Sequence, residues 1–361
     1  MLLRSLLVAS IAEAKALGLK KALKHSWGSL RALRHPRASF SALKRLRLLG
    51  MNRWLPKHER LFHIRHRFYL SQRLSTLQRT AAVLHHYDYE ARTFVPSYHR
   101  LVYGGRGLVL WRAEVDGVDF RIRLSASDQL RWEGDLSIEV FANETRVHVV
   151  SFTYVDAALF GLPSAPTMFI TRNQSMRDEP GWSLFRAAFK NTVPSYFGLA
   201  ATIGVAAGNG MHQVAAIGHE AQIAYEPEIA ATLKNSYDEF WRTFQAAEVE
   251  DGHVFLLPAP MALAPLSTVK AKHRKRAADR REAWSAIAAS SHAAILARIA
   301  REPAPDTDTA TESSAELAPS AAAAPGGASS PFGRVRAARN MMIATATVVA
   351  DVADAITHVV I

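Results

Sequence analysis

The chain has 361 residues, of which 49% are hydrophobic, and it carries a formal net charge of +12. It contains no cysteine, which excludes disulfide bonds, thiolate metal sites and a cysteine nucleophile and fits residence in the cytoplasm. Residues 1–60 hold fourteen Lys and Arg but two acids, while the rest of the chain is balanced, so the excess positive charge lies at one end.

The first segment, residues 1–57, is predicted to form basic amphipathic helices. Apolar residues recur at helical spacing in residues 2–24 and again in 26–49, and His35-Pro36 separates two halves of the second stretch. An apolar stripe flanked by Lys and Arg is typical of a helix that lies on an anionic membrane surface. Packing of the stripe on the core is the alternative, and nucleic acid is the least favoured partner because no reading motif is present.

Residues 58–301 are predicted to form a folded core of the α+β class. A helical region from Leu61 to Thr93 precedes a series of consecutive strands. Asp116-Gly117 lies between two of them and tolerates the positive φ angles of a tight hairpin, and a second turn is expected at 143–144. Short connections between consecutive strands imply a central, mainly antiparallel sheet.

The second half of the chain alternates helices with short strands. A helix interrupted near Pro194 ends at Gly208-Asn209-Gly210, which is interpreted as a helix cap rather than a phosphate loop because it follows a helix. Residues 270–287 are predicted to form a basic helix. Residues 302–331 contain five prolines and no Lys, Arg or aromatic residue, which predicts a disordered linker. Residues 332–361 are predicted to form an amphipathic helix that docks on a partner or a lipid surface.

Residues 60–287 contain six short stretches whose order and spacing resemble the VirK/YbjX family of bacterial proteins. These stretches are HHYD at 85–88, WEGDLSIEVF at 132–141, VVSFTY at 149–154, SYDEFW at 236–241, FLLP at 255–258 and KHRKRAADRREAW at 272–284. The resemblance implies a role in envelope integrity, virulence and resistance to cationic antimicrobial peptides, at the cytoplasmic face of the inner membrane. The chain departs from the family at Thr192-Val193-Pro194, where Leu-Arg-Pro is usual.

The order of predicted elements is also similar to that of the GNAT acyltransferase fold. In that fold, backbone amides at the start of a long helix hold the pyrophosphate of acyl-CoA. The corresponding residues here would be Arg172, Asn173 and Gln174, in a segment without the usual glycines. The resemblance implies acyl-CoA or another acyl donor, a lipid or peptide substrate and no metal. Non-enzymatic binding or scaffolding in envelope maintenance is the alternative hypothesis.

Residues 234–245, KNSYDEFWRTFQ, have two interpretations: a helix packed in the core or part of a reaction site. On one helix Tyr237, Phe240 and Trp241 share a face, so core packing explains them, while Asp238 and Glu239 are expected to face solvent. In a GNAT-like arrangement Tyr237 would instead protonate the leaving thiolate. Both interpretations stay open from the sequence.

Further candidates for chemistry are histidine and carboxylate side chains near predicted strands. His219 is a candidate general base, because imidazole titrates near neutral pH, and Glu133 is a candidate catalytic carboxylate at a strand start. His85 and His86 are adjacent on a helix and point about 100° apart, so they are interpreted as structural rather than metal ligands.

Two arginines of the predicted basic helix are candidates for phosphate or lipid binding. Arg276 and Arg280 are four residues apart and share a helix face, so together they could hold a phosphate through forked hydrogen bonds. The alternative is a solvated face that is partly paired with Asp279 and Glu282.

Overall fold

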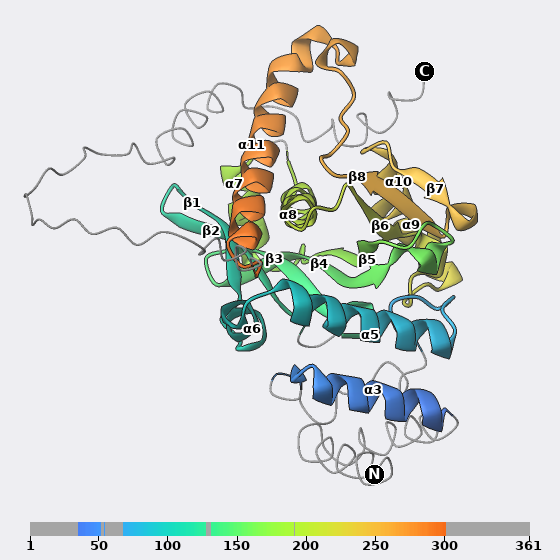
Figure 1. Cartoon of the computed structure of the whole chain (residues 1–361). Coiled ribbons are helices and arrows are strands. Elements are labelled where there is room, and N and C mark those ends of the chain that lie inside the picture. Colours follow the sequence, from blue (N-terminus) through green and yellow to red (C-terminus); the bar gives the residue numbers. More distant parts are fainter. Residues whose placement is uncertain (1–34, 52–53, 55–67, 128–130, 191, 301–361) are drawn as a thin grey trace, which may run out of the picture. The chain divides into compact units, whose positions relative to one another are not determined.

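The computed structural model describes residues 35–51, 54, 68–127, 131–190 and 192–300 (Figure 1). The predictions for the basic helices before residue 35, for the linker at 302–331 and for the helix at 332–361 lie outside these residues.

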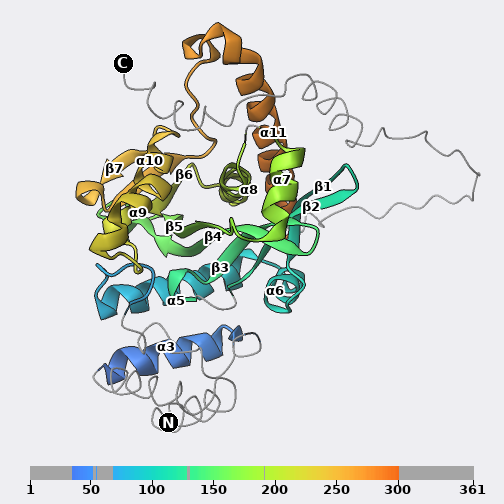
Figure 2. The same ribbon diagram turned by 180° about the vertical axis from the view of Figure 1, so that it is seen from behind.

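One eight-stranded sheet lies at the centre of the described fold, in the order β1-β2-β3-β4-β5-β6-β8-β7 (Figures 1 and 2). The strands are β1 Leu108–Val115, β2 Val118–Ala126, β3 Leu136–Ala142, β4 Thr145–Asp156, β5 Pro166–Ser175, β6 Gln213–Ile217, β7 Ala247–Val249 and β8 Val254–Pro258. Every neighbouring pair is antiparallel except β5 and β6, which are parallel. The predicted α+β class with a mainly antiparallel sheet is therefore confirmed.

Helices cover both faces of this sheet (Figures 1 and 2). Helices α5 and α6 lie on one face with α3 beyond α5, and α7, α8 and α11 lie on the other. Their bounds are α3 Pro36–Leu48, α5 Thr76–Thr93, α6 Pro96–Tyr103, α7 Pro180–Ala188, α8 Pro194–Gly208, α9 Ala230–Ser236, α10 Asp238–Arg242 and α11 Ala271–Leu296.

Local turn chemistry accounts for the hairpins that were predicted. Asp116 and Gly117 join β1 to β2 with φ angles of 53° and 76°, and Asn143 begins the turn from β3 to β4 with φ of 54°. The Gly208-Asn209-Gly210 segment ends α8, and Gly210 has φ of 71°, as a helix cap requires.

Helix α5 begins with a reciprocal cap and buries polar side chains against the sheet. The Ser75 hydroxyl accepts the N–H of Gln78 at 3.3 Å, and the Ser75 N–H donates to the Gln78 side chain at 2.9 Å. His86 is fully buried, and its Nδ1 accepts the N–H of Tyr154 at 3.3 Å, which is a structural role. Arg45 of α3 forms an ion pair with Asp88 and so joins α3 to α5.

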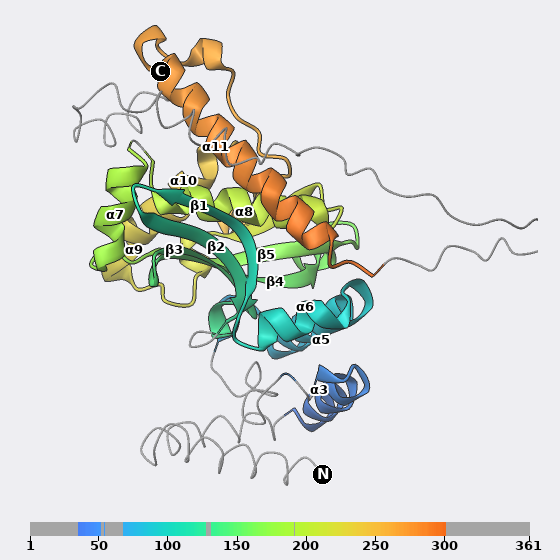
Figure 3. The same cartoon turned by 90° about the vertical axis from the view of Figure 1, so that its left-hand side faces the viewer.

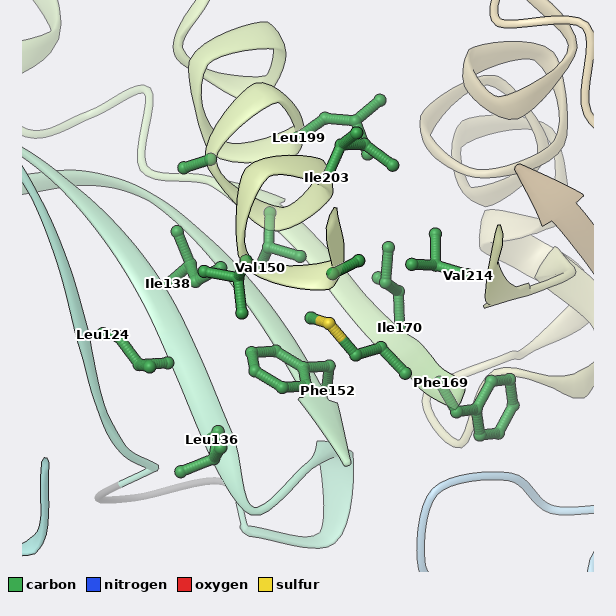
Figure 4. Packing of buried hydrophobic residues seen from close by; sticks show 14 of the residues in the cluster. Leu124, Leu136, Ile138, Val150, Phe152, Phe169, Ile170, Leu199, Ile203 and Val214 are labelled. Carbon is green, nitrogen blue, oxygen red and sulfur yellow. The ribbon is translucent and has the colours of Figure 1, made fainter. Parts of the chain in front are cut away.

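Helix α8 is the centre of the core on the other face. The helix lies over strand residues such as Val150 and Ile170, and its Leu199 and Ile203 belong to the same hydrophobic cluster (Figure 4). Glycines allow close approach on both sides of this helix. A Cβ at Gly198 would lie 2.8 Å from the His148 ring of β4, and one at Gly204 would lie 2.2 Å from the Ala288 carbonyl of α11.

The segment KNSYDEFWRTFQ differs from the single helix predicted for it. It divides at Tyr237, which has φ −117° and ψ −79°, into α9 and α10. Asp238 is buried rather than solvent-facing, because it accepts hydrogen bonds from His219. Trp241 has no exposed surface, and its Nε1–H donates to the Ile217 carbonyl at 2.9 Å, so the indole ties α10 to the end of β6.

Replacing Trp241 tests this attachment. Trp241→Ala should lower the free energy of unfolding by about 3–5 kcal/mol, because it removes a fully buried ring and leaves the Ile217 carbonyl without a donor. Trp241→Phe should cost less, because it keeps an aromatic ring and loses mainly one hydrogen bond, worth about 1 kcal/mol. Equilibrium urea unfolding measures both variants, and equal losses would contradict the packing described.

Candidate functional site

The parallel strands β5 and β6 part after two residues. Within these two strands Phe169 and Ile170 of β5 pair with Ala215 and Ala216 of β6, and no later position of β5 pairs with β6. On its other side β5 continues to pair with β4 as far as Ser175. The second half of β5 therefore has a strand neighbour on one side alone.

An extra residue in β5 marks the point of parting. Ile170 pairs with Phe152 of β4, and Arg172 pairs with the adjacent Ser151, so Thr171 has no counterpart of its own. Such a bulge bends a strand and re-aims the residues that follow it. The Thr171 hydroxyl donates to the Glu133 carbonyl, which joins the bulge to the turn before β3.

Tyr237 covers the edge of β5 where β6 has left it. Its hydroxyl oxygen accepts the backbone N–H of Asn173 at 3.3 Å, and the Asn173 side-chain amide donates to the Ser236 carbonyl at 3.0 Å. Tyr237 is 4% exposed. A tyrosine hydroxyl thus satisfies a buried backbone donor that no strand reaches.

Glu133, Arg172 and Gln222 form a buried polar group beside Tyr237. The Glu133 carboxylate lies 3.3 Å from Arg172 Nε and accepts a hydrogen bond from the Gln222 amide at 2.8 Å. Arg172 also donates to the Gln174 side chain at 2.9 Å. Glu133, Arg172 and Gln222 are all buried, whereas Gln174 is exposed.

Burial disfavours the charged forms of the acidic groups of this site. It raises the pKa of the Glu133 carboxyl, although the Arg172 charge and the Gln222 hydrogen bond act in the opposite direction. It also raises the pKa of the Tyr237 hydroxyl, and the Glu133 charge adds to that effect. The Tyr237 hydroxyl is therefore neutral at physiological pH.

His219 lies next to this group through Asp238, the residue after Tyr237. Its Nδ1 is 2.7 Å from one Asp238 carboxylate oxygen, and its backbone N–H donates to the other at 2.8 Å. Asp238 is 4% exposed, and the His219 side chain is 15% exposed. With its proton held on Nδ1 by the carboxylate, His219 keeps the Nε2 lone pair that a general base uses.

The structure thus brings together most of the residues singled out from the sequence. Tyr237, Glu133, Arg172, Asn173 and Gln174 surround the parting of β5 from β6, and His219 joins them through Asp238. One placement was wrong. Residues 172–174 were expected at the start of a helix, but they lie inside β5, because Arg172 and Asn173 are held in the sheet by buried partners.

Arg276 and Arg280 lie elsewhere, on the first turns of α11. Arg276 forms no ion pair with Asp279 or Glu282 within the described residues. Arg280 is partly buried and interacts electrostatically with Tyr196 in the first turn of α8.

Gln222, Asp238 and His148 were missed from the sequence. Gln222 and Asp238 owe their roles to partners remote in the chain, so no spacing reveals them, although the Tyr-Asp pair at 237–238 was visible. His148 alternates with apolar residues of β4, and a histidine on such a face is a signal that could have been noted. It is fully buried, and its Nδ1 lies 3.0 Å from the Ser175 hydroxyl.

No cluster of three or more His, Asp or Glu side chains among the described residues is arranged to hold a metal ion. None of the helices in the described part combines the length and apolar character needed to cross a membrane.

Together, the fold and the site define an α+β protein with a mixed sheet and a buried polar group where two parallel strands part. Residues 19–291 match the family described as "Protein of unknown function (DUF535)". The chain therefore belongs to the DUF535 family, which is consistent with the resemblance to VirK/YbjX proteins. No curated protein and no solved structure matches the chain.

His148 provides a pH-dependent test of the buried site. Burial lowers its pKa to about 3, whereas a histidine in the unfolded chain titrates near pH 6.5. Between these values the unfolded state binds a proton that the folded state does not, so stability should fall as the pH falls. The slope due to His148 should approach about 1.4 kcal/mol per pH unit.

Urea unfolding at a series of pH values measures this slope. The variant His148→Gln should show a shallower loss of stability in acid than the wild type, whereas the exposed His212→Gln should leave the slope unchanged. An identical slope in wild type and His148→Gln would contradict the burial of a neutral imidazole.

Proposed function

We propose that this protein is an acyltransferase that moves an acyl group from a thioester donor such as acyl-CoA to an amine or hydroxyl of a lipid or peptide. It acts at the cytoplasmic face of the bacterial inner membrane, in envelope maintenance and resistance to cationic antimicrobial peptides. The observation that carries the proposal is the hydroxyl of Tyr237 at the Asn173 amide, where β5 and β6 part.

The order of elements supports a GNAT-like arrangement. An antiparallel meander ends in β5, a long helix α8 connects it to the parallel strand β6, and a helix that starts at Tyr237 leads to the last antiparallel pair. In the GNAT fold backbone amides at the start of a long helix hold the acyl donor, and a tyrosine on a later helix protonates its sulfur. Fold analogy sets a prior, so the argument depends on the residues at the site.

The residues at the site can supply both proton transfers of acyl transfer. The attacking amine or hydroxyl gives its proton to His219 Nε2, while Asp238 stabilises the imidazolium through Nδ1. A new bond forms between the acceptor atom and the acyl carbon, and the carbon–sulfur bond breaks. The thiolate takes the proton of Tyr237, which burial keeps in place until that step. Tyr237 then recovers a proton from His219 through solvent, so the protein is unchanged.

Glu133 has a supporting role in this scheme. Its carboxylate is bonded to Arg172 and Gln222, and its charge is one of the causes of the raised Tyr237 pKa. It therefore holds Tyr237 in the neutral form that a general acid needs.

Non-enzymatic binding or scaffolding is a second candidate, and burial favours it. Tyr237 and Glu133 are 4% and 6% exposed, and their polar atoms already have partners within the protein. Such a cluster can serve to specify one packing of the core rather than to react. Donor binding separates the two candidates.

Tyr237→Phe is the sharpest test of the enzymatic role. The variant loses a hydroxyl and leaves the buried Asn173 N–H without its acceptor, so its free energy of unfolding should fall by about 1–3 kcal/mol. Donor binding, measured by calorimetry with acetyl-CoA and longer acyl-CoAs, should persist. The rate of thiol release with basic peptides and phospholipids as acceptors should fall at least about 100-fold, as expected for a lost general acid.

Tyr89→Phe is the matched control, because it removes a hydroxyl of α5 that donates to the Asn209 side chain at the end of α8. It should release thiol at the wild-type rate. An absence of acyl-CoA binding by the wild type, or full activity of Tyr237→Phe, would exclude this mechanism and favour the scaffold.

The outer side of α3 supports a location at an anionic membrane. Ser39, Ala42 and Leu46 are buried, while Phe40 and Leu48 are 47% and 69% exposed on the opposite side. Three basic residues, Arg37, Lys44 and Arg47, are also exposed, and the helix contains no acid. Apolar and basic groups on one side of a helix fit the boundary of an anionic bilayer.

Vesicle sedimentation of the full chain tests this location. The variant Phe40→Ser/Leu48→Ser should bind phosphatidylglycerol vesicles more weakly, and each basic residue of α3 replaced by Gln should reduce binding about fivefold at low salt. Leu77→Ser, at a position 70% exposed on α5, is the matched control and should bind as the wild type does. Unchanged binding in the α3 variants would show that α3 does not contact the bilayer.

A further inference from the structure

The N-terminal turns of α11 project beyond the first turn of α8. The Trp284 ring of α11 stacks on the Tyr196 ring, with centroids 4.8 Å apart and planes at 1°. Further along, Ala288 lies against Gly204, so residue numbers rise together in both helices. The residues of α11 before Trp284 therefore extend past the start of α8, as Figure 3 shows.

This projecting part of α11 is strongly basic. Residues 271–284 contain six Lys and Arg and two acids. Arg274 is occupied, because it donates to the Val269 and Ser267 carbonyls at 2.9 and 3.1 Å. Arg276 and Arg281 form no ion pair within the described residues. The Arg276 and Arg281 guanidinium groups lie close enough to Arg280 to act on its charge.

The charged form of the Arg280 guanidinium is destabilised by its surroundings. Burial lowers the pKa of its guanidinium, the charges of Arg276 and Arg281 lower it further, and the Tyr196 hydroxyl acts in the opposite direction. Grouped like charges on a half-buried helix face are stabilised when an anion binds between them. The geometry is therefore better suited to a bound polyanion than to water alone.

Two further sets of donors lie at the same place. Trp284 is 7% exposed, and its Nε1–H has no acceptor within the described residues. Arg280 precedes it by one helical turn, so both side chains lie on the same face of α11. Helix α8 is fifteen residues long and has no side-chain cap at its N-terminus. The free backbone N–H groups of its first turn and the helix dipole favour a negative charge there.

An aromatic connection joins this region to Tyr237. The Tyr196 ring contacts the Phe240 ring of α10 at 5.5 Å between centroids, and Phe240 contacts Trp241 at 5.1 Å. Tyr237 begins the same helix. The rings of Tyr196 and Phe240 therefore connect the basic end of α11 to the helix that follows Tyr237.

We propose that Arg276, Arg280, Arg281 and Trp284, together with the first turn of α8, form a phosphate-binding site for the phosphate end of the acyl donor. The donor is thus of the phosphopantetheine class, with its thioester reaching Tyr237. The positive charges of this site come from side chains of α11, and no glycine-rich loop contributes to it. The identity of the ligand rests on the proposed acyltransferase function, whereas the phosphate chemistry of the site stands independently of it.

Calorimetry on the full chain tests the site with inorganic pyrophosphate, coenzyme A and pantetheine. Pyrophosphate and coenzyme A should bind, and pantetheine, which lacks phosphate, should bind much more weakly. Arg276→Gln/Arg280→Gln should weaken both phosphate ligands at least about tenfold, because charge-assisted bonds are lost. Arg274→Gln is the matched control, since it removes one charge of the same helix whose guanidinium is already occupied, and it should bind as the wild type does.

Trp284→Phe adds a second test that leaves the net charge unchanged. It removes the indole N–H and keeps a ring against Tyr196, so pyrophosphate affinity should fall while thermal unfolding confirms that the variant is folded. Equal pyrophosphate affinity of the Arg274 variant and the Arg276/Arg280 variant would refute the site. It would show that pyrophosphate responds to the overall positive charge of the helix. Arg280-dependent binding of phosphatidylglycerol vesicles, without binding of coenzyme A or pyrophosphate, would overturn the assignment to the donor.

The outcomes also separate this site from the proposed function. Coenzyme A binding and Tyr237-dependent thiol release that survive Arg276→Gln/Arg280→Gln would refute the site and leave the acyltransferase standing. Pyrophosphate binding that depends on Arg280, without any thiol release by the wild type, would support the phosphate site and refute the acyltransferase.

Discussion

A buried strand edge must find hydrogen-bond partners for its backbone, and this constraint shapes the structure around β5. After Ile170 no residue of β6 pairs with β5, so the Asn173 N–H would be left without an acceptor. The Tyr237 hydroxyl is that acceptor, and it can reach Asn173 because the helical segment divides at Tyr237. Trp241 then fixes the position of α10 through the Ile217 carbonyl at the end of β6. One unsatisfied donor thus accounts for the break in the helix and for the position of the tyrosine.

Burial also selects the protonation states of the ionisable groups nearby. Glu133 is stabilised by Arg172 and Gln222, yet its environment still favours the protonated form more than water does. His148 on the opposite face of the sheet is neutral for the same reason. His148 and Tyr237 thus stay neutral near physiological pH, which suits structural hydrogen bonding.

The sequence predicted those parts of the fold that local chemistry decides. The hairpin at Asp116-Gly117 and the cap after α8 follow from residues that accept positive φ angles, and the sheet follows from consecutive alternating strands. The break at Tyr237 could not be predicted, because the 3.6-residue spacing of Tyr237, Phe240 and Trp241 continues through it. That break depends on a contact with Asn173, sixty-four positions earlier in the chain.

The same distinction applies to the candidate site. Tyr237, Glu133 and His219 were found from residue type and nearby elements, but their partners Gln222 and Asp238 depend on long-range packing. Arg172 and Asn173 were placed at the start of a helix by the GNAT analogy, whereas they lie inside β5. In the structure the Glu133 carboxylate compensates the burial of Arg172, and the Ser236 carbonyl compensates that of Asn173. Composition cannot reveal these partners.

The position of α8 has a consequence for synthesis of the protein on the ribosome. Thirteen of its fifteen residues are buried, with the sheet on one side and α11 on the other. Because α11 begins at Ala271, α8 emerges long before the helix that covers it is made. During that interval a nascent chain exposes an apolar, glycine-containing helix, a surface prone to aggregation. Completion of the core is therefore a late event, and chaperones that bind apolar segments would have their main target in α8.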